Sequence, residues 1–135
     1  MSRVLDVLGD KWSLLVVRDL LWADKHLFNE LMQCQEGIPS SVLADRLKRL
    51  EDAGIVVKTP YQQKPVRYAY RLTPAGIALH PLLKEIVQWG SAHFPDTSKV
   101  PEELMRRVEQ RYGLGRGPAG RRRGTRAGPD RHQNP

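Results

Sequence analysis

The sequence predicts a mainly helical α+β fold with one β-hairpin between its helices. Leucines at positions 43, 47 and 50 recur at spacings of four and three, which is typical of an amphipathic helix. Residues 66–72 then alternate apolar and polar side chains, which is typical of a half-buried strand. At 135 residues, of which 40% are hydrophobic, the chain is long enough for one domain with a core.

Two helices are expected before residue 23. Apolar residues at positions 4, 5, 7 and 8 predict a short first helix that ends at Gly9. Asp10 is suited to cap a second helix over residues 11–22, because its side chain can accept from unpaired N–H groups of the first turn. This second helix is apolar nearly all round, so we expect it to be buried.

A third and a fourth helix are expected around a tight turn at residues 36–39. The third should begin at Phe28 or Asn29 and end near residue 33, with positions 31 and 32 facing inward. Ser40 or Ser41 is expected to cap the fourth, whose three leucines face the core. The fourth helix should end at residues 53–54, because glycine readily adopts the positive φ that often closes a helix.

The hairpin is expected to have strands at residues 55–59 and 66–72, joined by a polar turn at residues 61–65. In the second strand, the alternation predicts one buried face and one solvent-facing side. The buried face would carry Val66, Tyr68, Tyr70 and Leu72, and the other side Arg67, Ala69 and Arg71.

After the hairpin, Thr73 and Pro74 form a cap followed by proline at the first helical position. A last long helix should run to about residue 93, with a kink or restart at Pro81. We expect residues 1–95 to form the domain and residues 96–110 a partly helical extension. The Gly, Pro and Arg composition of residues 111–135 predicts a disordered tail.

Helix, tight turn, helix and hairpin, in this order, predict a winged helix-turn-helix with flanking helices. The leucines of the fourth helix leave hydroxyls and charges facing outward. Because the start of such a helix reaches base edges in the major groove, we infer a face that binds double-stranded DNA. The candidate DNA-binding residues lie on this helix and at the hairpin tip: Ser40, Ser41, Asp45, Arg46, Lys48, Arg49, Gln62, Gln63, Lys64 and Arg67.

The distribution of charge supports this interface better than the net charge of +7 does. Residues 40–71 carry seven basic and three acidic side chains, whereas residues 1–39 carry four basic and six acidic ones. Much of the basic excess lies in the last 25 residues, with seven arginines and one aspartate. Asp45 does not fit this basic surface, because its carboxylate repels phosphate. It either pairs with a neighbouring arginine or accepts from a cytosine amino group.

Several short stretches occur in the order and at the spacing of one known family. They are LDVLGDKW at 5–12, LVVRDL at 15–20, FNEL at 28–31, GI at 37–38, VL at 42–43, RLKRLEDAG at 46–54 and YRLTPAG at 70–76. Through them, residues 3–94 resemble the HxlR-type family of MarR-like bacterial winged-helix regulators. The resemblance implies a homodimer built from the first and last helices, which binds a two-fold operator as repressor or activator.

Two positions depart from the family pattern. Many members carry a cysteine just before the first helix, and some sense electrophiles or oxidants with it. That position would precede Met1, so we do not expect a redox switch of this kind. Pro39 stands where the pattern often has serine, so capping should pass to Ser40. Cys34 is a candidate sensor, and the alternative is a small buried side chain.

Other site types find little support in the sequence. Trp12, Trp22 and Tyr70 could line a pocket for a small-molecule effector of unknown identity, or they are core aromatics. The histidines are scattered and no nucleophile motif or phosphate-binding loop is present, so we expect no metal, no cofactor and no enzymatic activity.

Two alternatives to a sequence-specific regulator stay open. One is a winged-helix module that binds proteins, and the other is a non-specific nucleic-acid binder driven by the basic tail. The tail itself could be an arm, inert, or an artefact of reading frame. A single cysteine, no export signal and no long apolar segment predict a cytoplasmic, nucleoid-associated protein that does not contact membrane.

Overall fold

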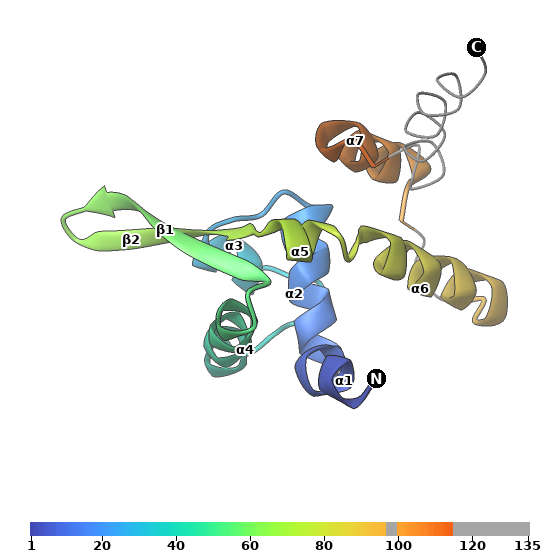
Figure 1. Cartoon of the computed structure of the whole chain (residues 1–135), viewed down its shortest axis with the longest axis horizontal. Coiled ribbons are helices and arrows are strands. Elements are labelled where there is room, and N and C mark those ends of the chain that lie inside the picture. The colour runs from blue at the N-terminus through green and yellow to red at the C-terminus, as the bar shows by residue number, and fades with distance from the viewer. Residues whose placement is uncertain (97–99, 115–135) are drawn as a thin grey trace, which may run out of the picture. The chain divides into compact units, whose positions relative to one another are not determined.

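The computed structural model describes residues 1–96 and 100–114. The chain divides into two units, residues 1–99 and residues 100–135, which are described separately. The first unit holds six helices and one hairpin within its described residues (Figure 1). Their bounds are α1 Ser2–Leu8, α2 Lys11–Leu21, α3 Phe28–Met32, α4 Ser40–Asp52, β1 Val56–Gln63, β2 Val66–Leu72, α5 Pro74–Ile77 and α6 His80–His93.

The start of α2 follows the sequence prediction. Helix α1 ends at Gly9, whose N–H donates to the Leu5 carbonyl at 2.7 Å. Asp10 has extended backbone and caps α2, because its side chain accepts from the Trp12 N–H at 3.2 Å. Val17, Leu20 and Leu21 are almost wholly buried, so α2 forms the centre of the core as expected.

The predicted serine cap of α4 is wrong. The N-cap residue is Pro39, which has extended backbone and whose carbonyl accepts from the Leu43 N–H at 2.9 Å. Ser40 and Ser41 are already helical and exposed, and neither hydroxyl caps the helix. Pro39 is extended because its ψ is 148°, so the helix starts at the residue that follows it. The hydroxyls consequently face outward.

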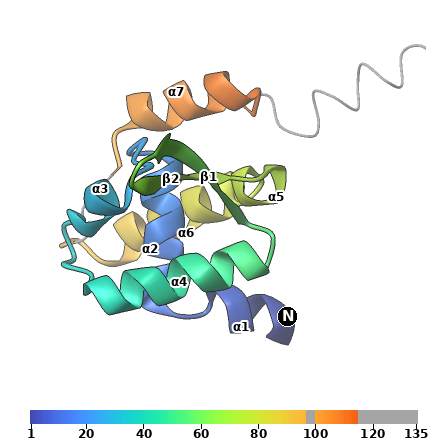
Figure 2. The same ribbon diagram turned by 90° about the vertical axis from the view of Figure 1, so that its left-hand side faces the viewer.

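The leucine stripe of α4 is confirmed. Leu43, Leu47 and Leu50 are at most 2% exposed. Helix α4 contacts α2 and β1, and Figure 2, which looks at the hairpin from its tip, shows α4 crossing in front of α2. Ala53 and Gly54 end the helix, with Gly54 at φ +78°, as predicted. These contacts fix which face of α4 remains accessible.

The hairpin is longer than predicted. Strand β1 runs through residues assigned to a turn and ends at Gln63, so only residues 64 and 65 separate the strands. The strands pair antiparallel, with a register shift between Pro60 and Gln62. The shift lets the strand pass Pro60, which has no N–H to donate, and continue outward.

The prediction that Val66, Tyr68, Tyr70 and Leu72 form a buried face of β2 is confirmed only at the base of the hairpin. Tyr70 and Leu72 are half-buried, whereas Val66 and Tyr68 are exposed because the outer hairpin extends past the helices (Figure 1). Ala69 was expected to face solvent but is 7% exposed. Leu27 forms an antiparallel backbone bridge with Ala69, so the segment before α3 lies beside β2 at this residue.

The helical region after β2 consists of the short helix α5 and the 14-residue helix α6. Thr73 caps α5 by accepting from the Gly76 N–H at 3.2 Å, and Pro74 takes the first helical position, as expected. Helix α6 starts at His80 with Pro81 in its first turn, which confirms a restart at this proline.

The second unit contains α7 Glu102–Tyr112, which ends at Gly113 with φ +68°. The tail was therefore placed too early, because Arg111 and Tyr112 are helical. The predicted disorder of the remaining tail falls on residues 115–135, which lie outside the described residues. Among the described helices, none has the length and apolar character needed to cross a membrane.

Candidate nucleic-acid interface

The exposed side of α4 begins with Ser40 and Ser41 at the helix start and continues with Lys48 about two turns later. Burial of the leucines against α2 dictates this orientation, since residues three and four apart share one face of a helix. The first-turn N–H groups of a helix have no intrahelical partners and carry partial positive charge. Hydroxyls, these N–H groups and a lysine thus point to the same side.

The charges on this side are paired with one another. Lys48 Nζ lies 3.2 Å from Asp52, and the two side chains are 70% and 62% exposed. Arg49 Nε lies 3.3 Å from Asp45, which also accepts from Arg46. The structure thus gives Asp45 the first of its two predicted roles. Exposed pairs of this type contribute little stability, so Lys48 and Arg49 can exchange carboxylates for phosphates at small cost.

Arg46 differs from the other predicted contacts because it is directed back toward α2. Its side chain is 20% exposed, and its Nε donates to the Asp10 carboxylate at 2.7 Å. The structure therefore does not bring Arg46 onto the open face with Lys48.

The hairpin tip presents cations beyond the body of the domain. Lys64, Arg67 and Gln63 are exposed, while Gln62 is half-buried and its amide donates to the Lys64 carbonyl at 3.4 Å. The sequence prediction did not include Lys58, which is exposed on β1. Its ammonium lies 4.7 Å from the Tyr68 ring centroid, across the hairpin. Lys58 lies within the strand expected at residues 55–59, so its basic side chain beside the hairpin was a signal available in the sequence.

The aromatics of the proposed effector pocket are separated. Trp22 is buried, and its Nε1–H donates to His80 Nδ1 at 3.0 Å. Trp12 is half-buried in the first turn of α2, about 15 Å along the helix from Trp22. Tyr70 contributes to a different feature, an open hollow of about 260 Å³ beside the hairpin. The hollow is lined by Leu27, Phe28, Asn29, Tyr61, Val66, Arg67, Tyr68 and Tyr70.

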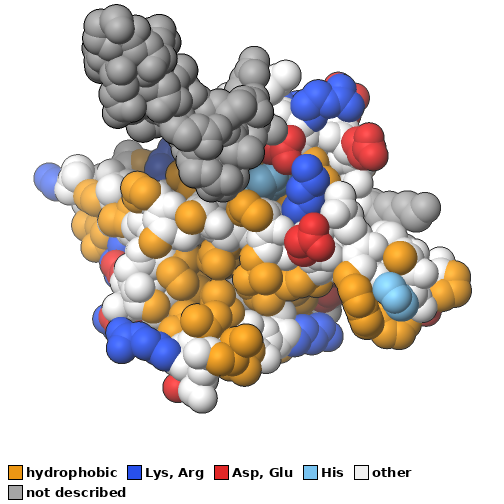
Figure 3. All heavy atoms as spheres, turned by 45° about the vertical axis from the view of Figure 1, so that its right-hand side comes forward, with side chains coloured by type: hydrophobic (Ala, Val, Ile, Leu, Met, Phe, Trp, Pro, Cys, Tyr) orange, Lys and Arg blue, Asp and Glu red, His pale blue; other side chains and the backbone are white. Residues whose placement is uncertain are grey.

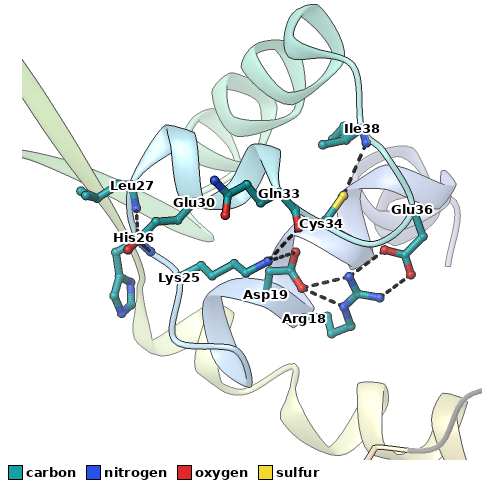
Figure 4. Close-up of polar contacts among 10 residues, drawn as sticks. All are labelled: Arg18, Asp19, Lys25, His26, Leu27, Glu30, Gln33, Cys34, Glu36 and Ile38. Atoms are coloured by element: carbon teal, nitrogen blue, oxygen red, sulfur yellow. Dashed lines mark hydrogen bonds and ion pairs between the residues drawn. The ribbon is translucent and has the colours of Figure 1, made fainter.

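Cys34 lies near a polar network between α2 and the turn before α4 (Figure 4). Its thiol is buried and accepts from the Ile38 N–H at 3.5 Å. Arg18 donates to both carboxylate oxygens of Glu36, at 2.7 and 2.9 Å, and this pairing lowers the pKa of Glu36. The network anchors the turn that leads into α4. A sensing role for Cys34 stays a prediction.

The described residues contain no group of three or more His, Cys, Asp and Glu side chains positioned to hold a metal ion.

An apolar surface extends over α1 and α6, on the side of the domain that comes forward in Figure 3. Large hydrophobic side chains on these two helices and just after α6 are about half exposed. They are Val4, Leu5, Leu82, Ile86, Trp89 and Phe94. Contiguous apolar surface of this kind typically marks a protein contact.

The sequence comparisons point to one family. The profile described as HxlR-like helix-turn-helix matches residues 7–98. An uncharacterized HTH-type transcriptional regulator of Mycobacterium tuberculosis is 33% identical over 103 residues, which cover 76% of this chain and 64% of that protein. This chain therefore spans less than two-thirds of the mycobacterial protein. The uncharacterized HTH-type transcriptional regulator YvaP of Bacillus subtilis is 36% identical over 90 residues, covering 67% of this chain and 82% of YvaP.

Solved structures agree with the fold. The crystal structure of PA1607 is 42% identical, with a TM-score of 0.63, and the match covers 73% of this chain and 68% of PA1607. The reduced form of the transcriptional regulator YodB from B. subtilis is 28% identical, with a TM-score of 0.58. That match covers 73% of this chain and 95% of YodB.

Proposed function

The chain belongs to the HxlR-like helix-turn-helix family of transcriptional regulators, and we propose that it acts as a homodimer on a pseudo-palindromic operator. It carries a helix-turn-helix DNA-binding domain, and the family consists of regulators rather than enzymes. The observation that carries the proposal is the open face of α4. Ser41 and Lys48 lie there together and Ser40 is exposed at the helix start, while the leucine stripe is buried.

Helix α4 would enter the major groove with its N-terminal end toward the bases. Ser40 and Ser41 would then offer hydroxyls to base edges or phosphates, beside the unpaired N–H groups of the first turn. Lys48 and Arg49 would exchange Asp52 and Asp45 for phosphate oxygens. Asp45 would limit non-specific affinity, because it places a negative charge on the same face.

The hairpin would act as the wing. Lys64 and Arg67 are exposed near its tip, and Gln62 and Gln63 supply amide groups there. Cations at this position suit a flanking phosphate or the minor groove, and contacts of this kind set orientation more than sequence. Lys58 extends the basic character along the outer strand.

A second copy of the chain would cover the apolar surface of α1 and α6. A two-fold axis through this surface brings the same side chains of both copies together, as isologous interfaces do. Two α4 helices related by such an axis read half-sites one helical turn apart, about 34 Å.

The proposal is tested by selecting duplexes from a randomised DNA library with the full chain. The expected product is an inverted repeat. Lys48→Ala should then weaken binding of the selected duplex and reduce the slope of log K against log salt by about one, because one phosphate contact is lost. Lys84→Ala removes the same charge from α6 and should change neither. Failure to enrich any sequence, or an unchanged slope for Lys48→Ala, would contradict the proposed interface.

A further inference from the structure

Arg46 and Asp10 join the candidate recognition helix to the start of α2. Arg46 lies in the second turn of α4, and its Nε donates to Asp10 Oδ2 at 2.7 Å. The same guanidinium donates through Nη1 to Asp45. A guanidinium is a rigid planar fork, so bonding to two carboxylates fixes its orientation.

Asp10 is itself held in place from several sides. Its carboxylate accepts from the Trp12 N–H at 3.2 Å and from the Ser13 hydroxyl at 2.6 Å, in addition to Arg46. Partial burial disfavours its charge, but these hydrogen bonds outweigh that effect and lower the pKa of Asp10 to about 2. The carboxylate therefore remains ionised and available to Arg46 throughout the physiological range.

The position of Asp10 links two parts of the molecule. It caps α2 immediately after Gly9, where α1 ends, and α1 belongs to the apolar surface described above. Through Arg46 the same residue holds the helix that carries Ser40, Ser41 and Lys48. Helix α4 also packs on α2 with its leucine stripe buried, and apolar packing of this kind limits separation of the helices more than it limits sliding or rotation.

We propose that Asp10 and Arg46 form an interhelical clasp that sets the orientation of α4, and that Arg46 is a positioning residue for operator recognition instead of a DNA contact. This inference rests on the proposed function, because the orientation of α4 affects operator recognition only if α4 binds DNA. The clasp fixes α4 relative to the junction of α1 and α2, so that the helices of the apolar surface and the recognition helix keep one relative orientation.

Asp10→Asn separates positioning from contact, because the two roles predict changes of opposite sign. Asparagine caps helices about as well as aspartate, so the start of α2 is preserved while the charge that holds Arg46 is lost. If Arg46 contacts DNA, releasing it and removing a negative charge should tighten binding. If Arg46 positions α4, binding of the selected duplex should weaken by about tenfold, the effect of one charge-assisted hydrogen bond. Binding of a scrambled duplex should not weaken.

Arg46→Met gives the second readout. The clasp predicts the same loss of specific binding, with an unchanged slope of log K against log salt. The double variant Asp10→Asn/Arg46→Met should bind the selected duplex no more weakly than either single variant. A slope reduced by about one would make Arg46 a phosphate contact and overturn the proposal. The matched control is Asp45→Asn, because Asp45 also bonds Arg46 but lies on the open face. The Asp45→Asn variant should bind the selected duplex more tightly. A loss of affinity equal to that of Asp10→Asn would contradict the specific role of Asp10.

A measurement without DNA tests the clasp independently. The midpoints of urea unfolding for Asp10→Asn, Arg46→Met and the double variant form a double-mutant cycle in the full chain. Non-additive losses are expected, because each substitution alone breaks the same contact. Additive losses would overturn the clasp whatever the DNA results. If the unaltered chain enriches no duplex, the proposed function fails, and this cycle still decides the clasp.

Discussion

Gly76 lies in the first turns after the hairpin, where no side chain fits. A Cβ atom at this position would lie 2.5 Å from the Ile55 carbonyl oxygen and 2.8 Å from a methyl group of Leu72. Both neighbours belong to the base of the hairpin, and one of them is backbone. The approach brings α5 against the strands, and it requires a residue without a Cβ.

Gly76→Ala should therefore destabilise the protein by about 1–3 kcal/mol, the usual effect of inserting a methyl group into a packed site. Urea unfolding followed by circular dichroism measures the change. Ala75→Ser alters an exposed neighbour in the same short helix and should stay within about 0.5 kcal/mol of the unaltered chain. Equal stability of Gly76→Ala and the unaltered chain would show that the backbone can withdraw from the contact.

Asp10 also predicts how stability changes in acid. Its pKa is about 2 in the folded chain and 3.8 in the reference state, so the folded state binds its proton less readily. The resulting stabilisation is fully present above pH 3.8 and is lost as the pH falls toward 2. Unfolding free energies measured from pH 5 to pH 2 should fall less steeply for Asp10→Asn. Parallel curves for the two proteins would contradict this assignment.

At the scale of elements, the sequence predicted correctly those features whose interactions join residues close together in the chain. Asp10 and Thr73 are caps in the structure as in the sequence, because their side chains bond to N–H groups two or three residues ahead. The same reasoning failed at Ser40. Pro39 takes the cap position because its extended backbone already supplies the first helical carbonyl, and a serine preference cannot displace it.

The hairpin has features that depend on contacts between residues distant in the sequence, and these were not predicted. The first strand was expected to end at residue 59, but pairing with β2 carries β1 past Pro60 through a register shift. Ala69 was assigned to the solvent side by alternation but is buried, and Leu27, more than forty positions earlier, pairs with it through a backbone bridge. Arg46 was placed with the DNA contacts because its spacing allowed it. Its bond to Asp10 depends on how α4 packs on α2, which no local pattern contains.

At the scale of the whole molecule, the fold and the open face of α4 were predictable from the sequence, since the leucine stripe fixes which face of this helix is buried. The assembly is a separate question. The apolar surface of α1 and α6 includes Trp89, which is 56% exposed, stacks on His93 and contacts Phe94 edge to face. Such a side chain is costly to leave in water, and a second copy would bury it.

If two copies pair through this surface as proposed, Trp89→Glu should give a monomer, because the interface would bury two unpaired carboxylates. Size-exclusion chromatography with light scattering measures the mass at micromolar concentration. Gln88→Glu adds the same charge to an exposed neighbour on α6 and should leave the mass unchanged. A monomeric unaltered chain, or a dimeric Trp89→Glu variant, would place the assembly surface elsewhere.

The central claim is that residues of the folded domain read a DNA sequence. Its most direct test is the ratio of affinities for the selected duplex and for a scrambled duplex of equal composition, both at physiological salt. We expect a ratio of about 10³ or more. The ratio should persist in a chain that ends at Leu114, which lacks six of the seven arginines of the last 25 residues. A ratio near one, or one that vanishes with this truncation, would contradict sequence reading by α4 and the wing.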